Sequence, residues 1–86
     1  MKIKYSKKAL KFLARQEKAT IDRIRAAVEK LTLTPPEGDI KDMQGSTSGM
    51  KRLRVGSFRV LFRYTSEGSF EILYIEEIGN RGDIYK

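Results

Sequence analysis

The sequence predicts an α+β fold in which two helices pack on one face of a mostly antiparallel sheet. Two observations support this prediction. Apolar residues recur at helical spacing between residues 7 and 33, and they alternate with polar residues between residues 50 and 78. A length of 86 residues fits one domain, spanning 1–86, with no room for a second of ordinary size. The expected order of elements is β-α-α-β-β-β.

The N-terminal part of the chain predicts one strand and two helices. Residues 1–5 alternate between apolar and Lys side chains, which is typical of a short half-buried strand. Ser6 offers an N-cap for a helix over about 7–17. A second helix is expected over about 19–33, and its end is set by the two prolines at 35 and 36. The apolar face of this helix is formed by Ile21, Ile24, Val28 and Leu31. Because little chain separates the helices, we expect an antiparallel hairpin.

The C-terminal part of the chain predicts three strands. Residues 39–49 are polar and rich in Gly and Ser, so we interpret them as a loop. Alternating residues over 50–55 and 58–64 are joined by Gly56 and Ser57, a pair typical of a tight hairpin turn. A further strand is expected over 70–78.

Composition excludes several classes of chemistry. The chain has 18 Lys and Arg against 11 Asp and Glu, a net charge of +7, and no Cys, His or Trp. It therefore has no disulfide, no Cys-based zinc site, no thiol nucleophile and no Ser-His pair, and we expect no cofactor or metal. No apolar stretch approaches the length of a membrane span and the N-terminus does not resemble a signal peptide, so the prediction is a cytoplasmic protein without a membrane partner.

The predicted hairpin over residues 50–63 contains five cations and no acid. These cations are Lys51, Arg52, Arg54, Arg59 and Arg63. Alternation places Arg52 and Arg54 on one face of their strand. It likewise places Arg59 and Arg63 on one face of the next strand. It directs Lys51 to the opposite face from Arg52. One face of the hairpin can thus pack on the helices while the other gathers guanidinium groups.

Two interpretations of this arginine cluster stay open. Arginine binds phosphate through a planar pair of donors and stays charged at any relevant pH, so the cluster favours an anionic ligand such as nucleic acid. Alternatively, some arginines pair with carboxylates of the neighbouring strand. The candidate carboxylates are Glu71, Glu76 and Glu77. Alternation also predicts that Glu76 and Glu77 point to opposite faces of their strand, which argues against a metal site formed by these two carboxylates.

The lysines at the start of the chain have a simpler interpretation. The first predicted helix carries four cations, and we expect them to form a solvated face. They are Lys7, Lys8, Lys11 and Arg15. Contact with an RNA backbone is the alternative role for this face.

Two motifs resemble those of the RelE/ParE superfamily of toxins. Residues 52–62 are similar to its signature hairpin, and residues 78–85 are similar to its ending, in which an Arg is followed four positions later by a Tyr. The resemblance extends over nearly the whole chain and includes the order of elements. It implies a toxin of a type II toxin–antitoxin system. In the RelE branch, these are small basic ribonucleases that cut mRNA in the ribosomal A site.

The resemblance also implies roles for individual residues. Arg52 and Arg54 correspond to the basic pair of the first hairpin strand, and Arg59 corresponds to the phosphate-holding arginine of the second. Arg81 and Tyr85 correspond to the catalytic arginine and the terminal catalytic tyrosine. Two of the departures from the family pattern concern residues near the expected site. The basic pair is arginine where well-studied members have lysine, and Asn80 stands where many relatives have histidine.

The expected reaction is metal-independent cleavage of mRNA through attack by the 2′-hydroxyl. Tyr85 is the predicted general base, because nearby cations favour the phenolate, and Arg81 is expected at the leaving group or the scissile phosphate. Arg54 and Arg59 stabilise the developing charge, while Arg52, Lys51 and Arg63 bind RNA. Since these acid–base groups are weak, the ribosome is expected to orient the substrate.

The resemblance implies two kinds of partner. One is the ribosomal 30S A site with its mRNA. The other is an acidic, partly disordered antitoxin that wraps the toxin in a hetero-oligomer. Two alternatives to the nuclease remain: a ParE-like inhibitor of DNA gyrase, and a catalytically degenerate toxin that binds RNA without turnover.

Overall fold

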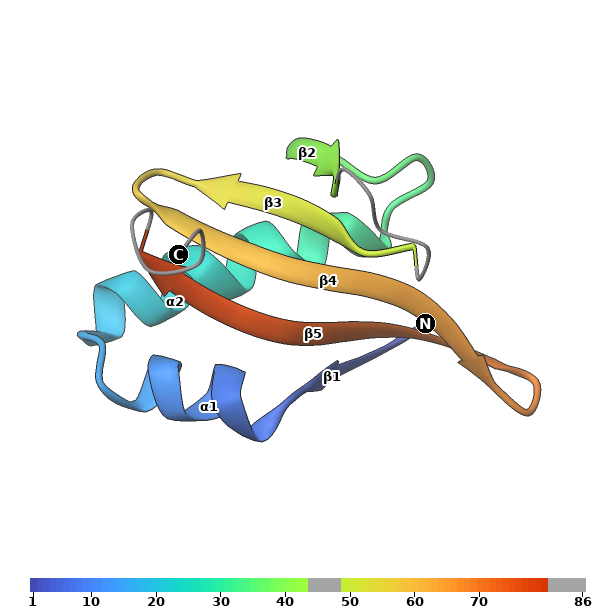
Figure 1. The fold of residues 1–86 in the computed structure, drawn as a ribbon, viewed down its shortest axis with the longest axis horizontal. Helices are drawn as coiled ribbons and strands as arrows, with labels where there is room; N and C mark the ends of the chain where they lie inside the picture. The colour runs from blue at the N-terminus through green and yellow to red at the C-terminus, as the bar shows by residue number, and fades with distance from the viewer. Residues whose placement is uncertain (44–48, 81–86) are drawn as a thin grey trace.

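The computed structural model describes residues 1–43 and 49–80, which form a five-stranded sheet with two helices on one face (Figure 1). In chain order the elements are β1 (Lys2–Tyr5), α1 (Lys7–Ala14), α2 (Lys18–Glu29), the 3₁₀ turn η1 (Lys30–Thr32), β2 (Asp39–Asp42), β3 (Lys51–Val55), β4 (Phe58–Glu67) and β5 (Phe70–Asn80). The strands lie in the order β1-β5-β4-β3-β2. All pairs are antiparallel except β1 with β5. The predicted α+β class with a helical layer on one face is confirmed.

The two helices differ slightly from the predicted ranges. Ser6 caps α1, accepting a hydrogen bond from the Ala9 amide at 3.0 Å. The helix ends at Ala14 rather than at residue 17, because the amides of Arg15 and Gln16 bond to carbonyls only three residues back. The second helix begins one residue earlier than predicted, and its last turn is the 3₁₀ turn η1. None of the helices in the described ranges is both long and apolar enough to cross a membrane.

The core lies between the helices and the face of the sheet that they cover, which we call the inner face (Figure 1). Strands β3 and β4 contribute alternate residues to it, as the period-two pattern predicts. The largest side chains with almost no exposure are Phe62, Ile24, Leu31, Leu53, Leu73 and Ile75. A chain this short has a small core, so each of these positions carries a large share of the stability.

Strand β2 is the element that the sequence analysis missed. Residues 39–49 were expected to form a loop, yet Asp39–Asp42 pairs with β3 as an edge strand. Ile40 is its only apolar residue, and it lies opposite Leu53 and packs against the core. At Gly38 the chain passes so close to the core that a Cβ would lie 2.7 Å from the Leu53 Cδ1 atom. Pairing with β3, not hydrophobic alternation, makes this segment a strand.

Strands β3 and β4 are joined by the predicted two-residue turn. Gly56 adopts a φ of +61° and Ser57 does not have a positive φ, the arrangement of a type II′ turn. Strand β4 then continues to Glu67, three residues beyond the predicted end at 64. The hairpin of β4 and β5 is consequently the longest feature of the sheet and extends past the helical layer (Figure 1).

Candidate nucleic-acid interface

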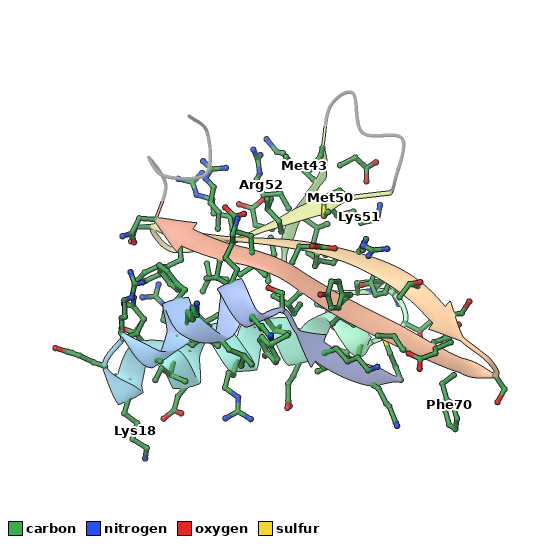
Figure 2. The ribbon with its side chains drawn as sticks, turned by 60° about the horizontal axis from the view of Figure 1, so that its bottom comes forward. Lys18, Met43, Met50, Lys51, Arg52 and Phe70 are labelled. Atoms are coloured by element: carbon green, nitrogen blue, oxygen red, sulfur yellow. The ribbon has the colours of Figure 1, made fainter. Side chains whose placement is uncertain are left out.

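The face of the sheet away from the helices, the outer face, carries the predicted arginine cluster. Arg54 of β3 lies directly opposite Arg59 of β4, and Arg52 lies opposite Leu61. Because opposed residues of paired strands point to the same side, these three arginines share one face. Figure 2 shows Arg52 on the side of the sheet away from the helices. The intervening pair, Leu53 and Val60, is buried in the core.

The three arginines differ in exposure. Arg54 is exposed, Arg52 is half-buried, and Arg59 is only 7% exposed. Like charges directly opposite each other destabilise a sheet, so a nearby anionic group stabilises the Arg54–Arg59 pair. A phosphate oxygen is such a group, and a guanidinium binds it through paired donors. The geometry therefore suits a phosphate-binding surface.

Arg63 pairs with a carboxylate of the neighbouring strand. Its Nε donates to Glu76 Oε1 at 2.9 Å, and its guanidinium lies 5.2 Å from the centre of the Tyr74 ring. The pairing of an arginine with a carboxylate of the next strand is therefore confirmed for Arg63. An arginine neutralised in this way is a weaker ligand for phosphate.

Lys51 is also engaged with a carboxylate. It forms an ion pair with Asp42 of β2. It lies opposite Phe62, a core residue, so it points away from the face of Arg52, as alternation predicts. A contribution of Lys51 to RNA binding stays a prediction.

The prediction that Glu76 and Glu77 point to opposite faces is wrong. Leu61 pairs with Glu77 and the next residue, Phe62, pairs with Ile75, so Glu76 is an extra residue that bulges from β5. The bulge turns both carboxylates toward one hollow of about 620 Å³. Among residues 1–43 and 49–80, no three acidic side chains come together as a possible metal site.

The solvated face predicted for the first helix is confirmed. The side chains of Lys7, Lys8, Lys11 and Arg15 are exposed. One of them makes an ion pair, from Lys8 Nζ to Glu77 Oε1 at 3.3 Å, with the lysine side chain 74% exposed. An ion pair so open to water is readily exchanged for another partner.

Arg81 and Tyr85, the two residues predicted at the C-terminus, lie outside the described residues. The last described positions are Gly79, opposite Arg59, and Asn80, opposite Phe58. The chain thus continues toward Arg81 from a point beside the buried arginine of the cluster. The catalytic roles of Arg81 and Tyr85 stay predictions.

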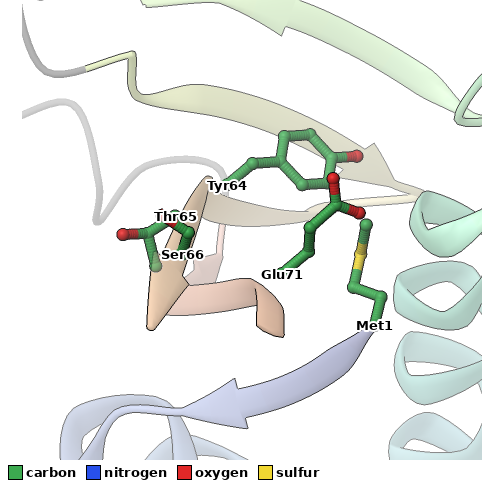
Figure 3. Close-up of a pocket in the computed structure, with 5 residues that line it drawn as sticks. All are labelled: Met1, Tyr64, Thr65, Ser66 and Glu71. Carbon is green, nitrogen blue, oxygen red and sulfur yellow. The ribbon is translucent and has the colours of Figure 1, made fainter. Parts of the chain in front are cut away.

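The described tyrosines that show altered acidity lie away from the arginine cluster. Burial raises the pKa of Tyr64, whose hydroxyl donates to the Leu31 carbonyl at 2.7 Å. Burial also raises the pKa of Tyr5, while the nearby Arg25 opposes the rise. Tyr64 borders a hollow of about 390 Å³ near the end of the β4–β5 hairpin, into which Met1 and Glu71 also point (Figure 3). This hollow contains none of the predicted functional residues.

Solved structures similar to this chain are toxins, alone or with antitoxins. The RelE of an archaeal RelE–RelB complex from Pyrococcus horikoshii is 24% identical over 95% of this chain and 96% of its own, with a TM-score of 0.70. A YoeB/ParE toxin from Agrobacterium tumefaciens is 19% identical over 93% of this chain and 98% of its own, with a TM-score of 0.72. A chain of the Methanococcus jannaschii RelB–RelE complex is 22% identical over 95% of this chain and 94% of its own, with a TM-score of 0.69. At these identities, the likeness shows a shared fold.

The sequence itself establishes the family. No curated protein matches it. The model of the ParE toxin family of type II toxin–antitoxin systems, however, matches residues 3–85, nearly the whole chain. The two motifs and the order of elements agree with this match. The chain therefore belongs to the RelE/ParE superfamily, the toxins of type II toxin–antitoxin systems.

Proposed function

We propose that this toxin is a ribosome-dependent endoribonuclease that cuts mRNA in the ribosomal A site. The observation that carries the proposal is the outer-face cluster of Arg52, Arg54 and Arg59, which lie in register on two neighbouring strands. Three guanidiniums on one sheet face suit the binding of successive backbone phosphates. They also suit the stabilisation of a scissile phosphate that becomes more negative in the transition state. The sequence continues from β5, beside Arg59, to Arg81 and Tyr85, which the family resemblance identifies as catalytic.

The proposed reaction needs no metal. The 2′-oxygen attacks the adjacent phosphorus as Tyr85 takes its proton, the bond from phosphorus to the 5′ oxygen breaks, and that oxygen takes up a proton. Arg54, Arg59 and Arg81 stabilise the additional negative charge in the transition state. Arginine is a poor proton donor because its pKa exceeds about 12. Much of the rate enhancement therefore comes from the ribosome, which holds the reacting atoms in line.

A cognate antitoxin is the second proposed partner. Structures of the similar toxins from Pyrococcus horikoshii and Methanococcus jannaschii are complexes with RelB antitoxins. A net charge of +7 favours an acidic partner for this chain. We propose that a partly disordered, acidic antitoxin wraps the toxin and covers the arginine cluster, which would silence it.

The test is primer extension on mRNA held in purified ribosomes, with and without the purified toxin. We expect cuts confined to the A-site codon, and we expect Arg81→Ala to abolish them without loss of the folded circular-dichroism spectrum. Lys18→Ala is the control, because it removes one exposed cation at the start of α2, on the side of the helices away from the sheet (Figure 2). Wild-type toxin that is folded and toxic yet leaves the mRNA intact would refute the nuclease proposal.

A second candidate function has one observation in its favour: the matching family model is that of ParE toxins. ParE-like toxins inhibit DNA gyrase and cut no RNA. The same preparation is therefore added to a gyrase supercoiling assay. Inhibited supercoiling with uncut mRNA favours gyrase as the target, whereas salt-dependent RNA binding without either effect favours a degenerate toxin.

A further inference from the structure

The hollow beside the β5 bulge adjoins the arginine cluster and has a composition that phosphate binding does not explain. Its volume is about 620 Å³, and its walls include Lys8, Met50, Leu61, Tyr74, Glu76 and Glu77. Leu61 lies opposite Arg52, so the hollow and the cluster are neighbours on the outer face. Figure 2 shows Met50 on the same side of the sheet as Arg52. The hollow therefore combines an aromatic ring with two carboxylates that are paired to Arg63 and Lys8, a lining unlike that of the arginine cluster.

Tyr74 lines this hollow, and the guanidinium of Arg63 lies over its ring. Their strands place them directly opposite each other, and the guanidinium lies 5.2 Å from the ring centre. Glu76 fixes the guanidinium through a 2.9 Å hydrogen bond and neutralises its charge. Aromatic rings and guanidinium planes are the surfaces on which proteins stack unpaired RNA bases. The arrangement therefore suits a base better than a phosphate.

Glu77 supplies the hydrogen-bond acceptors. Its two carboxylate oxygens can receive two adjacent N–H donors at once. Its ion pair with Lys8 spans 3.3 Å on a largely exposed lysine, so a ligand can displace it at small cost. Guanine is the one RNA base that presents two adjacent N–H donors, N1–H and the 2-amino group, on its Watson–Crick edge. Adenine and cytosine place an acceptor beside their amino group, which a carboxylate repels.

We propose that this hollow binds a guanine base of the RNA, with the ring on the Arg63–Tyr74 pair and the Watson–Crick edge on Glu77. Lys8, released from Glu77, then lies beside the sugar–phosphate backbone of the bound nucleotide. The arginine cluster holds phosphates and the hollow selects a neighbouring base. This inference rests on the proposal that RNA is the substrate.

The test measures the binding of short RNA analogues by fluorescence anisotropy. Labelled UGU, UIU and UAU trinucleotides with 2′-O-methyl riboses cannot be cleaved, so binding is separated from catalysis. We expect wild-type toxin to bind UGU about tenfold more tightly than UAU, as one good bidentate contact allows. Inosine lacks the 2-amino group, so UIU should fall between the two.

Two variants assign the preference to the hollow. Glu77→Gln should reduce the ratio of the UGU and UAU affinities to within about twofold, because one of the two acceptors becomes a donor. Tyr74→Leu should weaken all three trinucleotides about tenfold and keep their order, because stacking is tolerant of the base. Glu71→Gln is the matched control, since Glu71 lies on the same strand but borders the other hollow (Figure 3). It should behave as wild type.

Each outcome decides between the proposals. Equal binding of UGU and UAU by wild type overturns the guanine inference, and so does a preference that survives Glu77→Gln. A guanine preference lost in Glu77→Gln, in a toxin that leaves mRNA intact on ribosomes, supports the inference while refuting the nuclease. Cleavage on ribosomes by a toxin without base preference supports the nuclease and overturns the inference alone.

Discussion

The two faces of the β3–β4 hairpin show how one alternating sequence serves two purposes. The inner face carries Leu53 and Phe62, which are 1% and 0% exposed and pack against the helices. The outer face carries Arg52 and Arg54, which are half-buried and exposed. The first set belongs to the core cluster and the second set does not. Substitutions on the two faces should therefore separate stability from function.

The largest expected effect is on the inner face. Phe62→Ala removes the largest fully buried side chain, and we expect it to lower the free energy of unfolding by about 3–5 kcal/mol. Because small domains are only marginally stable, much of the protein should be unfolded at 37 °C. Urea unfolding followed by circular dichroism measures the loss. A loss below about 1 kcal/mol would mean that the inner face is not the centre of stability.

Ser6 connects the helical layer to the bulge on the outer face. Its hydroxyl oxygen accepts from the Ala9 amide and its O–H donates to the Glu76 carbonyl at 2.6 Å. Ser6→Ala loses both bonds, so we expect a loss of about 2 kcal/mol in the free energy of unfolding. Ser6→Thr, which keeps the hydroxyl, is the control and should lose less than half as much. Equal losses in both variants would show that the hydroxyl is not the connection.

The side of the molecule that holds the core should also respond to alkaline pH, through Tyr5 and Tyr64. Burial raises the pKa values of Tyr5 and Tyr64 above the usual value of about 10, so the folded state holds these protons more tightly than the unfolded state. The resulting stability is complete below about pH 10 and is lost as the pH rises through the folded-state values.

Urea midpoints between about pH 8 and pH 11 measure this loss. Tyr64→Phe should make the decline shallower than in wild type, because it removes one of the two phenols whose pKa is raised by burial. If the decline is unchanged in this variant, the phenol of Tyr64 is not a source of the alkaline sensitivity. Tyr74→Phe, which removes a phenol from the outer face, is the variant for comparison.

The sequence predicts the inner face better than it predicts the outer face, for a physical reason. Burial requires apolar side chains at a fixed period, so the helices, four of the five strands and most of the core follow from spacing alone. Strand β2 does not, because its pairing is with β3 and only Ile40 reaches the core. Backbone pairing at an edge leaves no periodic signal in a four-residue segment.

The sequence pattern likewise does not predict the bulge at Glu76. Alternation predicts opposite faces for two consecutive residues, and one extra residue in β5 reverses that result. The contact of Arg63 with Tyr74 was missed for the same reason, since the register of β4 on β5 was unknown. The roles of Arg81 and Tyr85 came from the family resemblance and need the proposed cleavage assay.

The smallest effect on stability is expected at Arg54, and it sharpens the contrast between the faces. Because its side chain is exposed, Arg54→Ala should change the free energy of unfolding by no more than about 0.5 kcal/mol. If Arg54 binds a phosphate, the same variant should reduce the slope of log affinity against log salt for single-stranded RNA by about 0.7. Lys18→Ala is the control, since Lys18 lies on the far side of the helices (Figure 2). An equal change of slope in both variants would mean that net charge, rather than the arginine cluster, attracts the RNA.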